Sequence, residues 1–446
     1  MKDLVVDVFL WGKCIGALAW DYEKEVASFQ YEDSFIRSGL DVSPITMPLS
    51  RGSSEIYQFL QNRNNCFHGL PGLIADSLPD KFGSEIINEW FISQGRDLSE
   101  VTPLDRLCYV GRRGMGALEF QPSKHLDGLD QSSKVHIEEL TRFADTIYQN
   151  RENFQELLRQ ENKGIIDILK IGTSAGGAKP KAIIALNEQT SEIRSGQVEA
   201  PEGFNYWLLK FDGTSYSEGD KVTSNPRGIG NIEYAYYRMA VDSGICMMES
   251  RLLSDGDNNH FMTKRFDRSE SGEKKHVLTL AGMAHFNRDQ RFSYEDGFNV
   301  IRRLRLPYPD QEEFFRRMVF NVLSRNHDDH TKNHSFLMDK KGRWSLAPAY
   351  DLCYSYSPSG RWTNQHQMSI HGKRANFTYQ DILSVGQHMG INKPEQILER
   401  TSHVISKWYR YAKDCGVCTN HAKQIQNNLL LLRGKQLSSF SSSLSM

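Results

Sequence analysis

The spacing of apolar residues predicts a mixture of strands and helices in the first third of the chain. The segment "LVVDVFLWGKCIGALAWD" holds two extended apolar runs around Gly12-Lys13, which predicts a β-hairpin, and "VASFQY" predicts a third strand. After residue 70, apolar residues recur every three or four positions, and Pro79 and Asp80 stand where a helix would begin. The glycine-punctuated segment "DRLCYVGRRGMGALEFQP" ends this first module, and a polar linker follows at residues 123–134.

Strands and helices alternate in the middle of the chain, and helices dominate the rest. Residues 136–163 have helical spacing, whereas "KAIIALN", "FNYWLLKF" and "HFMTKRFDR" predict strands. The segment "NIEYAYYRMAVDSG" predicts a helix between the last two of these strands. From about residue 267 helical patterns prevail, and the helix predicted at "EEFFRRMVFNVLSRN" has one apolar face, formed by Phe314, Phe315, Met318, Val319, Val322 and Leu323. The serine-rich end of the chain is expected to be disordered.

Length and composition are typical of a soluble protein with several domains. A chain of 446 residues is too long for one hydrophobic core, so we expect two or three domains. Apolar residues make up 39% and charged residues 24%, and the net charge is −1, so bulk charge predicts neither a nucleic-acid nor a membrane partner. The start of the chain lacks a signal-peptide pattern, and no segment approaches the roughly 18 apolar residues of a membrane helix.

The seven cysteines are scattered, which is typical of a reducing compartment and predicts a cytoplasmic location. Cys415 and Cys418 form a single CxxC motif. A zinc site would need further ligands, and a thioredoxin motif would need a strand-to-helix context that is missing here. Ordinary buried thiols near a helix end are therefore the favoured interpretation.

The segment "RNHDDHTKNHSFLMDKKGRWSLAPAYDL", residues 325–352, carries the densest set of proton carriers and ligands. A predicted helix leads into a loop with the pattern D-x-x-x-x-N, a predicted hairpin follows, and Asp351 comes after the hairpin. Protein kinases have this order of elements, with a base and two metal ligands. Here Asp328 would accept a hydroxyl proton, Asn333 and Asp351 would offer oxygen ligands to Mg²⁺, and Lys332 would hold a phosphate oxygen.

Two other interpretations of this loop stay open on its residues alone. The pattern D-x-x-x-x-N also arises by chance in a charged surface turn. His327, His330 and His334 have a spacing that would suit zinc on a helix face, but no established zinc motif is present.

The upstream sequence contains further features that an ATP site requires, in the expected chain order. Residues 172–182, "GTSAGGAKPKA", form a glycine-rich loop with lysines beside it, and backbone amides of such a loop can surround phosphates. Lys210 lies within an apolar strand, where a cation needs a partner, and ATP phosphates would supply that partner. Glu233 lies in the following helix, and residues 261–268 stand where a hinge to the helical part would be.

These motifs resemble the HipA family of bacterial serine/threonine kinases, the toxin halves of toxin–antitoxin pairs. The resemblance covers nearly the whole chain. The matching segments are "ITMPLS" (45–50), "GLIADSLPDKFG" (72–83), "YVGRRGMGALEF" (109–120), "SAGGAKPKA" (174–182), "WLLKF" (207–211), "KRFDR" (264–268), "DDHTKNHSF" (328–336) and "LAPAYDL" (346–352). Where eukaryotic kinases have DFG this chain has "YDL", so their activation machinery is not implied.

The resemblance implies a role for each matching residue. Asp328 and Lys332 would be catalytic, Asn333 and Asp351 would bind Mg²⁺, and Ser174 would be autophosphorylated, with Thr173 as an alternative acceptor. Contacts to ATP are implied for Gly176, Gly177, Ala178, Lys179, Lys181, Lys210, Lys264, Phe266 and His330. A phosphoserine on the loop would repel ATP phosphates and switch the enzyme off.

The family also implies an architecture. We expect an α+β, two-lobed kinase-like fold with a small β-rich N-lobe, a large helical C-lobe and an α/β accessory domain in front. The expected ranges are 1–130 for the accessory domain, 131–266 for the N-lobe, 267–437 for the C-lobe and 438–446 for a disordered tail.

The implied activity is ATP- and Mg²⁺-dependent phosphorylation of a protein, with an aminoacyl-tRNA synthetase as target and growth arrest as the outcome. The implied partner is a HipB-like helix-turn-helix antitoxin that links the kinase to operator DNA. Two rival functions are a co-repressor with little catalysis, which ATP turnover would distinguish, and a metal-dependent hydrolase, which would leave the glycine-rich loop and Lys210 unexplained.

Overall fold

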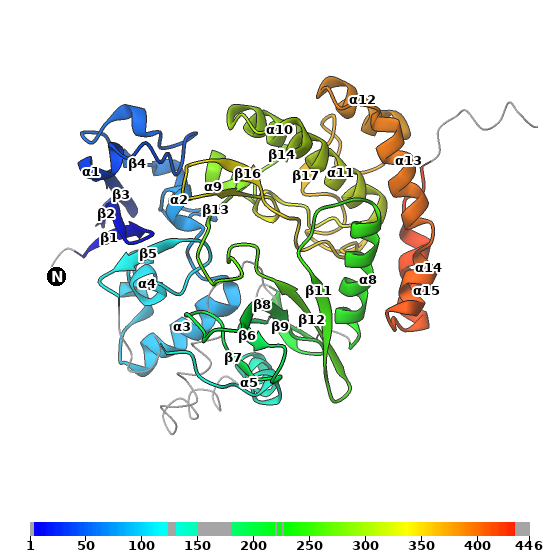
Figure 1. Cartoon of the computed structure of the whole chain (residues 1–446), viewed down its shortest axis with the longest axis horizontal. Coiled ribbons are helices and arrows are strands. Elements are labelled where there is room, and N and C mark those ends of the chain that lie inside the picture. The colour runs from blue at the N-terminus through cyan, green and yellow to red at the C-terminus, as the bar shows by residue number, and fades with distance from the viewer. Residues whose placement is uncertain (1–3, 124–130, 150–179, 219–220, 225–226, 433–446) are drawn as a thin grey trace, which may run out of the picture. The chain divides into compact units, whose positions relative to one another are not determined.

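The computed structural model describes residues 4–123, 131–149, 180–218, 221–224 and 227–432 (Figure 1). The chain forms two compact units that are not continuous in sequence. The first combines Met1–Tyr234, Met248–Gln290 and His334–Pro348, and the second combines Ala235–Met247, Arg291–Asn333 and Ala349–Met446. The domain boundaries expected at residues 130 and 266 stay predictions, and the expected tail lies outside the described residues.

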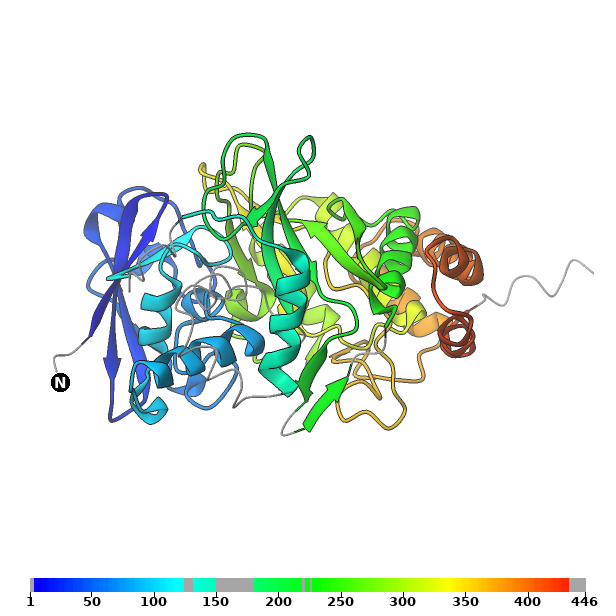
Figure 2. The ribbon, with the colours of Figure 1, turned by 90° about the horizontal axis from the view of Figure 1, so that it is seen from below.

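An antiparallel five-stranded sheet begins the first unit, and in Figure 2 its strands are drawn in blue, except the last one in sequence, which is cyan. The predicted hairpin is confirmed, because the first two strands pair from Leu10 opposite Lys13 onward. Gly12 closes the turn with a φ of 77°, a conformation that glycine adopts without strain. In sheet order the strands are β4 (Ile56–Gln58), β3 (Val26–Tyr31), β2 (Lys13–Asp21), β1 (Val5–Leu10) and β5 (Leu118–Gln121).

Short helices accompany this sheet, and α3 (Lys81–Ser93) is the longest of them. Its predicted start is confirmed, because the Asp80 carboxylate accepts a hydrogen bond from the backbone N–H of Gly83 at 2.6 Å. The other helices of this region are α1 (Asp33–Ile36), α2 (Gly72–Ala75) and α4 (Pro103–Val110), with 3₁₀ turns η1 (Leu49–Arg51), η2 (Leu60–Asn62) and η3 (Leu98–Glu100).

A second five-stranded sheet shares its hydrophobic core with α3. Phe82, Ile86 and Phe91 of that helix pack in one cluster with Ile184 and Trp207 of the sheet. This shared core explains why the N-terminal module and the second sheet belong to one unit. In sheet order the strands are β11 (Ser250–Asp255), β12 (Asn258–Lys264), β8 (Phe204–Lys210), β6 (Lys181–Asn187) and β7 (Ile193–Ser195).

The remaining elements of the first unit include the hairpin predicted after the D-x-x-x-x-N loop. That hairpin is confirmed, and the Asp339 carboxylate closes it by accepting hydrogen bonds from the N–H groups of Lys341 at 2.9 Å and Arg343 at 3.0 Å. The helix predicted at 136–163 is described only as far as residue 149. These elements are α5 (Ile137–Gln149), β9 (Ser215–Glu218), β10 (Lys221–Ser224), β13 (His276–Thr279), α9 (Leu280–Ala284), β15 (Ser335–Met338) and β16 (Trp344–Leu346).

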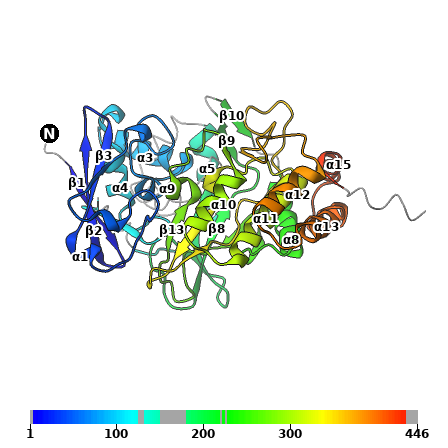
Figure 3. The same cartoon turned by 90° about the horizontal axis from the view of Figure 1, so that it is seen from above.

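Helices dominate the second unit, as Figure 3 shows. The apolar face predicted for α11 is confirmed, since all six of its residues are at most 1% exposed. Arg325 ends this helix in the left-handed conformation, with a φ of 61°. The elements are β14 (Phe292–Ser293), α10 (Tyr294–Arg303), α11 (Tyr308–Ser324), η4 (Thr331–Asn333), β17 (Met368–Ser369), α12 (Tyr379–His388), α13 (Pro394–Ile405), α14 (Trp408–Asp414) and α15 (Thr419–Asn428), and α8 (Ile229–Asp242) belongs to both units.

This combination of a β-rich and a mainly helical unit confirms the predicted α+β class. Among the described residues, no helix combines the length and the apolar composition needed to cross a bilayer. Cys415 is buried at the end of α14, as expected, whereas Cys418 is exposed at the start of α15.

Candidate active site

Lys210, the last residue of β8, forms an ion pair with Glu233 of α8 inside the first unit. The side chains are 17% and 8% exposed, so both charges are largely withdrawn from water and depend on each other. The Lys210 ammonium also lies 5.7 Å from the centre of the Phe261 ring. The structure therefore gives the strand lysine a carboxylate partner from the helix, where the sequence analysis expected ATP phosphates, and the role of both residues in ATP binding stays a prediction.

Asp212 holds the start of α8 and was not identified from the sequence. Its buried carboxylate accepts hydrogen bonds from the N–H groups of Gly228 at 3.0 Å, Ile229 at 2.9 Å and Asn259 at 3.3 Å. These bonds satisfy amides that a helix start leaves without partners. By fixing this helix end, Asp212 positions the turn that carries Glu233. The helix has no Ser, Thr, Asp or Asn directly before it. The absence of a local N-cap residue could have indicated that a distant residue caps this helix.

The hinge motif "KRFDR" is organised around Asp267, a second carboxylate that sequence reasoning missed. Burial raises the pKa of Asp267, but Arg265 and Arg268 outweigh burial and hold its pKa well below the usual range. Its carboxylate lies 2.6 Å from a guanidinium nitrogen of Arg265 and 2.8 Å from one of Arg268. It also accepts a hydrogen bond from the N–H of Gly116 at 2.8 Å. The segment "YVGRRGMG" is thus bound directly to the hinge motif.

The two predicted adenine-contacting residues lie at the edge of this cluster. Lys264 ends β12, pairs with Glu249 at 2.7 Å and has its ammonium 5.4 Å from the centre of the Trp207 ring. Phe266 is half-buried. The predicted contact of Lys264 and Phe266 with adenine stays a prediction.

Lys181 is nearly inaccessible to solvent. It begins β6, and its ammonium lies 3.6 Å from the Asp80 carboxylate, with side chains 6% and 1% exposed. Burial raises the pKa of Asp80 to about 7, and the charge of Lys181 acts in the opposite direction. The remaining predicted loop residues, Thr173, Ser174, Gly176, Gly177, Ala178 and Lys179, lie outside the described residues.

In the second unit, the loop after α11 presents Asp328 to solvent, with its side chain 52% exposed. The backbone carbonyl of Asp328 accepts a hydrogen bond from the side-chain N–H of Asn333 at 2.7 Å. This bond closes the loop and uses the nitrogen end of the Asn333 amide. His330 lies with its Nε2 3.6 Å from the Asp328 carboxylate. An exposed carboxylate on a loop closed by Asn333 suits a base that must reach a substrate.

Lys332 and Asp351 flank the same loop. The Tyr350 hydroxyl donates to the backbone carbonyl of Lys332 at 2.7 Å, and the Asn326 side chain donates to that of Asp351 at 3.4 Å. Asp351 has a φ of 53°, which Asp tolerates better than most residues. The structure thus ties the residues on both sides of the predicted hairpin to the second unit.

The donor set of Asn333 and Asp351 fits Mg²⁺, a hard ion that prefers oxygen ligands and retains water. The Asn333 amide donates through its nitrogen, so its oxygen is the atom that would coordinate a metal ion. In the described part of the chain, no group of three or more His, Cys, Asp or Glu side chains is placed to hold a metal ion, so the zinc alternative has no ligand set there. His327 instead binds the backbone carbonyl of Thr363 through Nδ1 at 3.0 Å.

Asp329, next to the candidate base, is completely buried and supports the loop from beneath. Its carboxylate accepts hydrogen bonds from the Tyr294 hydroxyl at 2.8 Å, His366 Nδ1 at 2.8 Å and the N–H of Gln367 at 2.7 Å. Burial raises the pKa of Asp329, but the charge of His366 and these hydrogen bonds outweigh it and lower the pKa below its usual value. Asp329 is a structural residue that the sequence pattern alone did not separate from Asp328.

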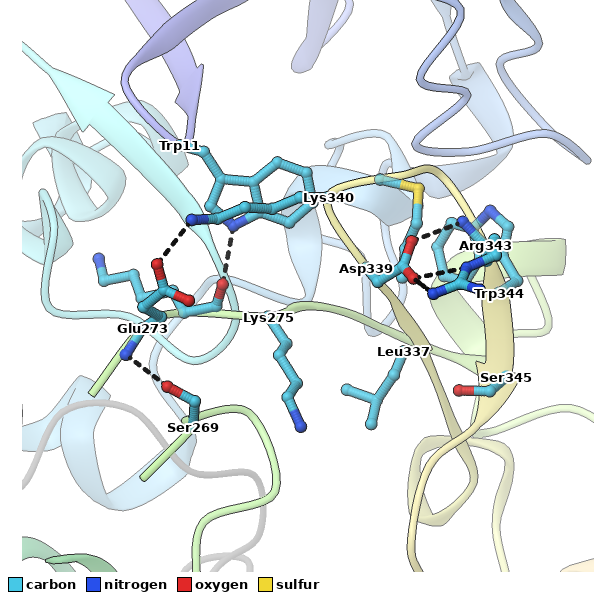
Figure 4. Close-up of a pocket in the computed structure, with 12 residues that line it drawn as sticks. Trp11, Ser269, Glu273, Lys275, Leu337, Asp339, Lys340, Arg343, Trp344 and Ser345 are labelled. Atoms are coloured by element: carbon cyan, nitrogen blue, oxygen red, sulfur yellow. Dashed lines mark hydrogen bonds and ion pairs between the residues drawn. The ribbon is translucent and has the colours of Figure 1, made fainter. Parts of the chain in front are cut away.

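An open pocket of about 460 Å³ lies elsewhere in the first unit (Figure 4). Trp11 donates to the backbone carbonyl of Lys274 at 2.8 Å on one side, and the hairpin with Asp339 and Arg343 forms the other. None of the predicted site residues lines this pocket.

Comparison with known proteins identifies the family. The family described as HipA-like C-terminal domain matches residues 173–409, more than half of the chain, and the HipA N-terminal domain family matches residues 6–121. The serine/threonine-protein kinase toxin HipA of Shewanella oneidensis is 22% identical over 377 residues, which cover 79% of this chain and 75% of that protein. A Haemophilus influenzae protein named "Putative kinase" is 27% identical over 192 residues, and the match spans only 56% of its length.

A solved structure shares the fold of this chain. It is described as the Shewanella oneidensis MR-1 toxin–antitoxin system HipA, HipB and its operator DNA complex, and the match has a TM-score of 0.63 at 17% identity. The match covers 95% of this chain and 94% of that one. The two family matches, which cover both the N-terminal module and the catalytic-loop region, show that this chain belongs to the HipA family.

Proposed function

We propose that this chain is an ATP- and Mg²⁺-dependent serine/threonine protein kinase. The observation that carries the proposal is the loop after α11, where the Asp328 carboxylate is exposed while its backbone is fixed by Asn333. Asp328 accepts the proton of a substrate hydroxyl as the oxygen attacks the γ-phosphate of ATP. The kinase names of two relatives support this assignment.

The other site residues have supporting roles in the proposed reaction. Lys210, oriented by Glu233, binds ATP phosphates, and Lys332 and His330 stabilise phosphate oxygens near the base. Lys264 and Phe266 bind the adenine ring. Asn333 and Asp351 hold Mg²⁺, which when bound supplies charge neutralisation on the phosphates.

The proposed partners follow from the family. The substrate is a hydroxyl group of a cytoplasmic protein, and the target is an aminoacyl-tRNA synthetase. Phosphorylation of this enzyme stops translation and arrests growth. A HipB-like helix-turn-helix antitoxin binds the kinase and links it to operator DNA, a proposal supported by the HipA, HipB and operator DNA composition of the Shewanella complex. The operator DNA in the same complex favours one alternative function, a co-repressor with little catalytic turnover. An assay of ATP hydrolysis or phosphoryl transfer distinguishes the two, because a co-repressor would show little of either.

We expect the purified protein to label itself with γ-labelled ATP and Mg²⁺, and Ser174→Ala to remove most of the label. The reason is that Ser174 is the only serine of the glycine-rich loop at residues 172–182. The measurement is the label on the intact protein, followed by mapping of the labelled peptide, with Thr173→Ala as the matched control. Full labelling of Ser174→Ala with loss in Thr173→Ala would move the acceptor by one residue. No label in a protein that intact mass shows to be unphosphorylated would favour the co-repressor.

We expect Asp351→Asn to weaken ATP binding in the presence of Mg²⁺ and to have little effect without it. Asparagine keeps the left-handed backbone conformation of residue 351, so the substitution removes the negative charge without adding backbone strain. Calorimetric titration with ATP, with and without Mg²⁺, measures the difference. Equal affinities of wild type and variant in Mg²⁺ would remove Asp351 from the proposed metal site.

A further inference from the structure

A buried ion pair joins the N-terminal module to the first strand after the glycine-rich loop. Asp80, from the "DSLPD" part of the N-terminal motif at 72–83, lies 3.6 Å from the Lys181 ammonium. At 6% and 1% exposure neither side chain has water as an alternative partner. Buried charges of this kind are costly unless each compensates the other, so the positions of the two residues depend on one another.

The sheet register gives this pair a relation to the proposed phosphate lysine. Lys181 stands directly opposite Lys210 in the antiparallel pairing of β6 and β8. Like charges at directly opposed positions repel each other and destabilise a sheet. Here each lysine pairs with its own carboxylate. Lys181 pairs with Asp80, which caps α3, and Lys210 pairs with Glu233 of α8. The register thus places two lysines, each with its own carboxylate partner, at neighbouring positions where β6 begins and β8 ends.

The rest of the "DSLPD" segment is fixed to the same unit. The Asp76 carboxylate accepts hydrogen bonds from the N–H of Thr279 at 2.7 Å and from its hydroxyl at 3.0 Å. The following helix, α3, begins at Lys81 and packs its Phe82 and Ile86 in the core shared with β6 and β8. The segments before and after Asp80 are therefore both anchored, by the hydrogen bonds of Asp76 and by the packing of α3. A positioning residue requires such anchoring.

We propose that Asp80 is a positioning residue for ATP binding, through which the N-terminal module fixes the side chain of Lys181, so that Lys181 and the opposite Lys210 bind phosphate together. The inference rests on the proposed kinase function. It assigns to the N-terminal module a direct part in nucleotide affinity, in addition to any role in binding partners. Asp80 itself does not touch the nucleotide, because its effect passes through Lys181.

The test is Asp80→Asn, assayed at pH 8, where a carboxyl group with a pKa of about 7 is mainly ionised. Asparagine is as good a helix N-cap as aspartate, so the hydrogen bond from Gly83 is retained while the charge is lost. The expected result is a rise in KM for ATP of about tenfold, comparable to the loss of one hydrogen bond to a charged group, with kcat changed by less than about twofold. The matched control is Asp97→Asn, which replaces an exposed N-cap aspartate of the same module, whose carboxylate accepts a hydrogen bond from the N–H of Ser99 at 2.9 Å.

Lys181→Met provides the second arm, because it removes the cation without altering the helix cap. It should raise KM for ATP by the same factor, and adding Asp80→Asn to it should cause no further rise, since the pair acts as a unit. Additive effects of the two substitutions on KM would overturn the proposal. An unchanged KM for ATP in Asp80→Asn, measured beside an active wild type, would also overturn it. A wild type that neither binds nor turns over ATP would overturn the kinase assignment itself, and the inference with it. Should Asp80→Asn fail to fold by circular dichroism, the comparison of Lys181→Met with wild type decides the question.

Discussion

Replacing Asp328 by alanine should reduce phosphoryl transfer about 10²–10⁴-fold, the usual contribution of a positioned base. The side chain is 52% exposed, and its carboxylate lies 3.6 Å from His330 Nε2. The hydrogen bond from Asn333 goes to the backbone carbonyl, which alanine retains. The free energy of unfolding should therefore change by less than about 0.5 kcal/mol. Initial rates with γ-labelled ATP, together with chemical denaturation of the same preparations, measure both quantities.

The control for this substitution is Asp257→Ala, which removes a carboxylate that is 86% exposed from the turn between β11 and β12. It should leave the rate and the stability unchanged. ATP binding should survive in Asp328→Ala, since the residue is assigned to the proton and not to the nucleotide. Transfer at wild-type rate in Asp328→Ala would exclude the residue as the base and return the loop to the charged-turn interpretation.

The sequence pattern was sufficient wherever contacts are local. Residues three or four apart share a helix face, so the apolar positions of α11 follow from spacing alone. Asp80 caps a helix that starts one residue later, and Asp339 closes a hairpin within four residues. The order of motifs also placed Glu233 in a helix that could reach Lys210.

The pattern failed where a carboxylate takes its partners from distant parts of the chain. Asp267 is held by Gly116, 151 residues away, and Asp212 by the start of α8, 16 to 18 residues away. Nothing local distinguishes such residues from exposed acids, because their burial is decided by tertiary packing. Lys181 shows the same limit, since the spacing predicts a loop lysine and the structure finds a buried one paired with Asp80.

The neighbouring pair Asp328 and Asp329 illustrates this difference within one dipeptide. In the sequence both are loop carboxylates of equal standing. In the structure one is exposed, whereas the other is buried by a tyrosine 35 residues before it and a histidine 37 residues after it. Exposure makes the first available for chemistry, and burial makes the second a support of the loop that carries it.

Replacing Asp329 by alanine should accordingly lower the free energy of unfolding by about 3–5 kcal/mol, the cost of removing one partner of a buried charge pair. The Tyr294 hydroxyl, His366 Nδ1 and the N–H of Gln367 would all lose their acceptor in a buried site. Chemical denaturation measures the loss, and Asp328→Ala is the matched control one residue away. A loss below about 1 kcal/mol would contradict the structural role and mean that water enters the site.

The pH dependence of stability provides an independent check on the same residue. The folded-state pKa of Asp329 is lowered, because His366 and the hydrogen bonds outweigh burial. A lowered pKa means that the contribution of Asp329 to stability is fully present above the unfolded-state value of about 4 and is lost as the pH falls through the folded-state pKa. Wild-type stability should therefore fall on acidification in this range more steeply than that of Asp329→Ala, which no longer binds that proton. Parallel acid-unfolding curves of the two proteins would show that the pKa of Asp329 is the same in the folded and unfolded states, and would contradict a stabilising charge at this position.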